Sequence, residues 1–173
     1  MNAHLLFAGA AVIVSVASTS HHAQTPGPLD NVPEKMPNDI PYGEPIGLQR
    51  ADRVLDGALA ESQKRTWKEV CAVVDSGGSL VSLKRMDGAQ LASIDNAIHK
   101  ARTSVKYRRD TKAFEASVQG GNYYQLTLDD VIASRGGVLL LEAGRLIGAI
   151  GCSGGTGSQD EVVAKAGVAA LDK

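Results

Sequence analysis

The sequence predicts an α/β fold in which helices flank one antiparallel central sheet. Two apolar hairpin patterns carry this prediction, at residues 70–83 and at residues 138–150. In each, two short apolar runs are joined by a turn that contains glycine, and helical sequence lies beside the hairpin. Because the strands of a hairpin are antiparallel, two helix-flanked hairpins indicate one antiparallel sheet.

Length and composition favour a single globular domain with extensions. The chain has 173 residues, of which 43% are hydrophobic, and its formal net charge is −1. A near-neutral charge argues against a dedicated nucleic-acid-binding protein. Aromatic residues make up only 4% of the chain, which disfavours a stacking surface for bases or sugars.

The first compositional break is the apolar run Leu5–Ala17, which is followed by small residues and Ala23-Gln24. The run has the length of a signal-peptide core and is too short to cross a bilayer as a helix. We therefore expect residues 1–23 to be a signal peptide, and the mature protein to be periplasmic or secreted without membrane insertion. The alternative is a buried or disordered N-terminal strand, since no Lys or Arg precedes the run and His21 is unusual two positions before Ala23.

All six prolines lie between Gln24 and Ile46. Proline lacks a backbone donor and fixes φ, so this segment cannot be a helix or a central strand. The sequence predicts an extended proline-rich linker over residues 24–46 and a compact domain over residues 47–173.

The first half of the domain begins with a predicted amphipathic helix over Gly47–Lys64, whose apolar residues recur at helical spacing. Trp67 follows as a candidate core residue. Strands are predicted at Val70–Val74 and Leu80–Leu83, around the turn 75–79. A second helix is expected from Ser93, as its N-cap, to about residue 107, with a clean apolar stripe on one face.

The second half begins with a short helix, expected from Thr111 to the glycines at 120–121. Residues 122–135 fit a loop or a strand equally well. The second hairpin then leads into the glycine-rich loop 151–157. Ser158 and Glu161 have the spacing of a capping box, which predicts a helix starting there with Val162 on its inner face.

A glycine-rich loop that opens a helix presents free N–H groups and a partial positive charge, which suits an anion or a carboxylate. The alternative is a tight strand-to-helix connection without a ligand. Nucleotide-binding loops are excluded: the loop has no lysine for a Walker motif, and its strand belongs to an antiparallel hairpin.

His99 would be the single histidine of a chain cleaved after Ala23. One histidine excludes a multi-histidine metal site but suffices as one axial haem ligand. Asp95, one helical turn earlier, could hold the other ring nitrogen. The alternative is an exposed histidine in a solvated charged row.

Two cysteines and a basic row complete the candidates. Cys71 and Cys152 fall in or just after predicted inner strands, where they either pair or remain buried thiols. The row contains Lys100, Arg102, Lys106, Arg108, Arg109 and Lys112. It is either a solvated face or a clamp for carboxylates.

Several motifs recur in an order typical of one family: Asp75-Ser76-Gly77-Gly78, Arg85-Met86-Asp87-Gly88-Ala89, Lys100-Ala101-Arg102-Thr103, Gly148–Gly155 and Gln159-Asp160-Glu161. With them the chain resembles the GlcG/HbpS haem-binding family over residues 48–171. That family is also similar to the C-terminal domain of PduO-type cobalamin adenosyltransferases. The resemblance implies a profilin-like α/β sandwich and homo-oligomers.

The resemblance also implies a function. The expected function is extracytoplasmic, reversible, non-covalent haem binding, for storage, sensing or breakdown of haem, with His99 as the iron ligand. The expected cofactor-binding residues are His99, Arg102, Arg85, Lys100, Ser153, Gly154 and Gly155. One alternative is an enzyme for a small organic acid that uses Lys100, Arg85, Asp87 and the loop 153–155 as a polar pocket. Another is a non-catalytic oligomeric accessory protein.

Overall fold

The computed structural model describes residues 32–172 of the chain, so the predicted signal peptide lies outside the described residues. The chain divides into two units, residues 1–35 and residues 36–173, and every helix and strand described lies in the second unit. Among the described residues, no helix combines the length and apolar character that a membrane span requires.

A four-stranded antiparallel sheet forms the centre of the second unit, which confirms the predicted fold class. Its strands are β1 (Val70–Asp75), β2 (Leu80–Arg85), β3 (Gly137–Glu142) and β4 (Arg145–Ser153), and their order across the sheet is β2-β1-β4-β3. The two predicted hairpins therefore meet along the pair of inner strands, β1 and β4.

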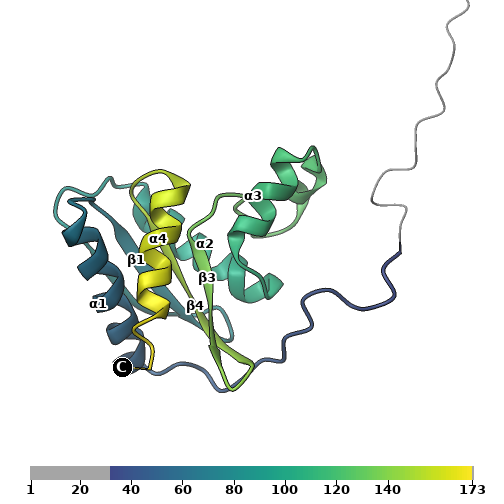
Figure 1. Cartoon of the computed structure of the whole chain (residues 1–173), viewed down its shortest axis with the longest axis horizontal. Helices are drawn as coiled ribbons and strands as arrows, with labels where there is room; N and C mark the ends of the chain where they lie inside the picture. The colour runs from purple at the N-terminus through teal and green to yellow at the C-terminus, as the bar shows by residue number, and fades with distance from the viewer. Residues whose placement is uncertain (1–31, 173) are drawn as a thin grey trace, which may run out of the picture. The chain divides into compact units, whose positions relative to one another are not determined.

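Helices cover both faces of this sheet (Figure 1). α1 (Leu48–Lys64) and α4 (Gly157–Val168) lie side by side on one face, and α2 (Ser93–Tyr107) packs on the other. α3 (Thr111–Gln119) and the 3-10 helix η2 (Tyr123–Thr127) follow α2, so residues 122–135 contain helical turn and loop rather than a strand. The largest apolar cluster lies under α1 and α4.

Glycines in β3 and β4 allow α2 to approach the sheet closely. A Cβ atom at Gly151 would lie 2.0 Å from the carbonyl oxygen of Ala97 in α2, and one at Gly137 would lie 2.3 Å from that of Lys100. No side chain fits into such a contact. Glycine at these two positions therefore fixes the depth at which α2 lies, and with it the positions of His99 and Lys100.

Cys71 and Cys152 face one another in the register of β1 and β4 and form a disulfide. Both are fully buried. Of the two alternatives that the sequence allowed, the structure has the paired cysteines.

The end of the predicted linker is extended and lies against the domain. Tyr42 forms a parallel bridge with Leu146, and the N–H of Ile46 donates to the carbonyl oxygen of Ile147 at 2.9 Å. β4 extends beyond the end of β1 there, and residues 42–46 occupy the place beside it. The Tyr42 hydroxyl also donates to the carbonyl oxygen of Val105 at 3.0 Å.

Two predicted helix starts were wrong. α4 begins at Gly157, with Thr156 as its N-cap and Gln159 completing the capping box. Ser158 and Glu161 do not cap it, and Val162 is exposed rather than on the inner face. Ser93 is not an N-cap either: it is the first residue of α2 and fully buried, after the N-cap Ala92.

Candidate functional site

His99 lies on the outer side of α2, in a cavity of about 310 Å³. Ile98 and Arg102 from the same helix line this cavity with it, as do Asp95 and Asp130. The cavity thus combines an imidazole, an apolar side chain and a guanidinium group. A second cavity, of about 320 Å³, lies between residues 42–44 and the β3–β4 turn, and its lining includes none of the predicted site residues.

Asp130, rather than Asp95, contacts the His99 ring. Its Oδ1 lies 3.2 Å from His99 Nε2, and its Oδ2 lies 2.5 Å from Lys106 Nζ. The His99 contact falls short of normal hydrogen-bond geometry, so the buried Nε2 has no hydrogen-bond partner among the described residues. The bond to Asp130 raises the pKa of Lys106.

The loop that carries Asp130 is attached to α2 by Thr103. The Thr103 hydroxyl donates to the carbonyl oxygen of Asp130 at 3.0 Å and accepts from the N–H of Ile132 at 3.1 Å. Asp130 itself has a φ of 57°, a left-handed conformation that Asp tolerates better than most residues. These contacts hold the carboxylate over the histidine.

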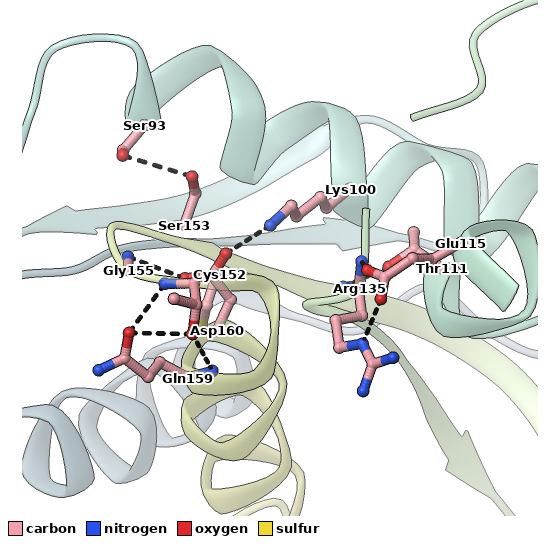
Figure 2. A network of polar contacts seen from close by, with 12 residues as sticks. Ser93, Lys100, Thr111, Glu115, Arg135, Cys152, Ser153, Gly155, Gln159 and Asp160 are labelled. Atoms are coloured by element: carbon pink, nitrogen blue, oxygen red, sulfur yellow. Dashed lines mark hydrogen bonds and ion pairs between the residues drawn. The ribbon is translucent and has the colours of Figure 1, made fainter. Parts of the chain in front are cut away.

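Lys100, which follows His99 in α2, points the other way, into the interior. Its Nζ lies 2.6 Å from Asp160 Oδ2, and both side chains are only 3% exposed. Asp160 belongs to the first turn of α4, and its Oδ1 accepts from the N–H of Gly155 at 3.1 Å. Figure 2 shows this pair between the two helices, with the hydroxyl contact between Ser93 and Ser153 close by.

Glu69, directly before β1, adds a third ionisable side chain to this buried pair. Its side chain is fully buried, and neither carboxyl oxygen has a hydrogen-bond partner in the described part of the chain. Burial, followed by the nearby Asp160 carboxylate, raises the pKa of Glu69 to about 8. Burial thus favours the neutral, protonated form of Glu69.

The glycine-rich loop is closed by contacts within the chain. The N–H of Gly155 bonds to Asp160, and that of Thr156 donates to Gln159 Oε1 at 2.8 Å. A Cβ on Gly154 would lie 2.2 Å from the carbonyl oxygen of Lys68, so this glycine serves close backbone packing. Two of the N–H groups that made the loop a candidate anion site thus have partners already.

The predicted cofactor-binding set accordingly divides into separate groups. His99 and Arg102 share one cavity. Lys100, Ser153, Gly154 and Gly155 belong to the buried cluster around Asp160. Arg85 is exposed at the end of β2. Among the described residues, no three His, Cys, Asp or Glu side chains are grouped as a metal site.

Sequence reasoning did not identify the roles of Asp130, Asp160 and Glu69. Asp130 lies in the segment whose structure the pattern left open. Asp160 was identified only as a member of the motif Gln159-Asp160-Glu161, without a role. A buried Glu69 could have been predicted, because an acidic residue directly before a fully buried strand has little water to solvate it.

Known proteins resemble this chain along nearly the whole domain. The family model described as "Haem degrading protein HbpS-like" matches residues 46–169. Protein GlcG of Escherichia coli K12 is 39% identical over 108 residues, which cover 62% of this chain and 81% of GlcG. The corrinoid adenosyltransferase PduO of Citrobacter freundii is 29% identical over 131 residues, which are 73% of this chain and 39% of PduO.

Solved structures share the fold. A crystal structure of the Klebsiella pneumoniae protein ORFY aligns with a TM-score of 0.71 and 27% identity, over 80% of this chain and 98% of ORFY. A PduOC:heme complex aligns with a TM-score of 0.66 and 28% identity, over 73% of this chain and 94% of PduOC.

Proposed function

The chain belongs to the HbpS-like family, and from this premise we propose that it binds haem reversibly and without covalent attachment, outside the cytoplasm. Storage, sensing or breakdown of haem would be its role. The observation that carries the proposal is the placement of His99 in a cavity together with Ile98 and Arg102. Support from a relative comes from PduOC, whose structure was solved as a haem complex.

The residues of this cavity fit a haem group chemically. Imidazole is a common axial ligand of haem iron, and a guanidinium group pairs well with the carboxylate of a propionate. A histidine that binds iron through one ring nitrogen often donates the N–H of the other ring nitrogen to a carboxylate. Because Nε2 faces Asp130, His99 would offer Nδ1 to iron, with Arg102 one helical turn away.

The disulfide supports the proposed compartment. Disulfides form and persist in oxidising environments such as the periplasm, and they are rare in the cytosol. The fully buried pair Cys71–Cys152 joins the two inner strands of the sheet. Intact-mass measurement after expression in a bacterial host tests export: we expect an extracytoplasmic protein that begins near Gln24.

We also propose assembly into homo-oligomers. Exposed apolar side chains gather on η2, where Tyr123 and Leu126 are 67% and 57% exposed. Exposed apolar groups of this kind favour protein contacts. Light scattering should give a mass above that of one chain, and a monomer throughout the micromolar range would contradict the proposal.

Titration with hemin tests haem binding directly. We expect a saturable Soret band from the purified protein, and its replacement by the Soret band of holomyoglobin when apomyoglobin is added as a competing acceptor, because the haem is held without a covalent bond. A spectrum that remains that of free hemin would contradict haem binding. The alternative of a small-acid pocket at loop 153–155 is weakened by the internal bonds of Gly155 and Thr156.

A further inference from the structure

The buried cluster opposite His99 brings a nucleophile, an electrophile and an acid together. Lys100 Nζ is 2.6 Å from a carboxylate oxygen of Asp160, and both side chains are 3% exposed. Glu69 is fully buried and has no hydrogen-bond partner among residues 32–172, and its Oε2 would lie 2.9 Å from a Cβ on Gly154, next to the Gly155 that binds Asp160. Lys100 belongs to α2, Asp160 belongs to α4, and Glu69 directly precedes β1. The cluster therefore forms only when the chain folds.

An ion pair in this position is a costly arrangement. Removing an ammonium and a carboxylate from water costs several kcal/mol for each ion, and their attraction offsets this only with good additional hydrogen bonds. Asp160 has one such bond, from Gly155. An amide between the same two side chains carries no charge and avoids the cost.

The two groups are also held in contact, with Lys100 Nζ 2.6 Å from Asp160 Oδ2. Two reacting groups held in contact behave as if at very high concentration, with effective molarities of about 10⁵ M or more in well-oriented cases. We propose that Lys100 and Asp160 become joined by an isopeptide bond, with Glu69 as the proton shuttle and the Gly155 N–H as the oxyanion donor. This proposal is independent of haem binding.

The step balances without a cofactor. A proton first passes from the Lys100 ammonium to the Asp160 carboxylate, which leaves a neutral amine and a carboxylic acid. Nζ attacks Cγ of Asp160 and forms the N–C bond, and the charge that develops on Oδ1 lies 3.1 Å from the N–H of Gly155. The bond from Cγ to Oδ2 then breaks.

Glu69 moves the protons in this step. Its carboxylic acid protonates the departing Oδ2, and its carboxylate receives a proton from the attacking nitrogen, so that Glu69 ends in its starting state. The sum is one ammonium and one carboxylate converted into one amide and one water. The product would link α2, on one face of the sheet, to α4 on the other.

Mass spectrometry of the purified mature protein under denaturing conditions, after reduction of the disulfide, tests the bond. We expect an intact mass lower than the sequence mass by one water. Trypsin should fail to cut after Lys100, and one fragment should contain the peptides of Lys100 and Asp160 joined together. The full sequence mass would overturn the proposal, as would a lost water that maps to any other pair, including Lys100 with Glu69.

Substitution of the acid tests the shuttle. Glu69→Gln keeps the size of the side chain but cannot exchange a proton with the reacting groups, so we expect this variant at its full mass. Glu44→Gln is the matched control, because Glu44 is exposed and distant from the cluster in the sequence. It should lose one water like the parent. Loss of water in Glu69→Gln would overturn the role of Glu69.

Discussion

Asp130 Oδ1 lies 3.2 Å from Nε2 of His99, although the two residues belong to different segments of the chain. The same carboxylate binds Lys106, and Thr103 holds its backbone. The carboxylate that faces the imidazole is therefore held in place by α2 itself, through Lys106 and Thr103.

Substitution of Asp130 should weaken haem binding. Asp130→Asn removes the charge that faces Nε2, and loss of such a carboxylate behind a ligating histidine costs roughly 10–100-fold in affinity. Hemin titration of the variant measures this, with Asp129→Asn as the control, because it removes the neighbouring carboxylate and keeps the backbone carbonyl that accepts from the Tyr107 hydroxyl. Equal affinity and equal spectra for Asp130→Asn and the parent would show that Asp130 does not position the ring.

Stability should decrease as the pH rises through the neutral range, because of Glu69. Burial, together with the Asp160 carboxylate, raises its pKa from 4.5 to about 8. The native state thus keeps a proton that the unfolded state has released. This contribution to stability is complete below about pH 4.5 and is lost as the pH approaches 8, by at most about 1.4 kcal/mol per pH unit.

The Glu69→Gln variant provides the comparison. A glutamine side chain does not titrate, so the variant should lack the specific loss of stability that Glu69 causes between about pH 4.5 and 8. Urea unfolding of both proteins at a series of pH values measures the difference. Burial, the largest cause of the shift, acts whether or not Asp160 is linked to Lys100. Parallel pH profiles for the two proteins would exclude a raised pKa at Glu69.

The disulfide should contribute substantially to stability. It closes a loop with a sequence separation of 81, and a native disulfide typically contributes about 2–4 kcal/mol. The double variant Cys71→Ala/Cys152→Ala should unfold at lower urea concentration than the oxidised parent. Addition of a reductant should destabilise the parent and leave the variant unchanged. A parent insensitive to the reductant, with no thiols that react after unfolding, would contradict this.

A side chain at Gly154 should destabilise the domain. Its Cβ would meet the carbonyl oxygen of Lys68 at 2.2 Å, and the backbone must move to relieve that contact. We expect Gly154→Ala to lower the free energy of unfolding by roughly 1–3 kcal/mol, as overpacking does. Gly47→Ala is the control, since nothing lies within 4 Å of a Cβ there. Thermal unfolding compares the two, and equal melting temperatures would contradict the prediction.

The pattern of apolar residues was sufficient to predict the sheet and most helices. β1 and β4 are continuous buried runs, and the stripe of α2 that contains Ala97, Ala101 and Val105 faces the sheet as its spacing indicated. The start of α4 was misplaced because two capping boxes overlap there. Thr156 and Gln159 form the real one, whereas Glu161 is engaged by basic side chains: Lys112, Arg135 and Lys165.

The contacts of the candidate site were harder to predict, because they join distant segments. Local spacing pointed to Asp95 as the partner of His99, whereas the chain returns through residues 128–134 to place Asp130 there. Lys100 lies next to His99 in the sequence, but the turn of the helix directs the two side chains to opposite sides. The expected cofactor-binding set, which followed the family resemblance, nevertheless placed both residues at one site.

The spectrum of the hemin complex of His99→Ala, compared with the parent and with Tyr107→Phe, tests the central claim most directly. Tyr107→Phe is the matched control, because it removes a phenol oxygen on α2, which is another possible donor to haem iron, and keeps the ring that packs on Phe114. We predict that the parent and Tyr107→Phe give the same Soret band and that His99→Ala loses or strongly shifts it. An unaltered Soret band in His99→Ala would show that His99 is not the haem ligand.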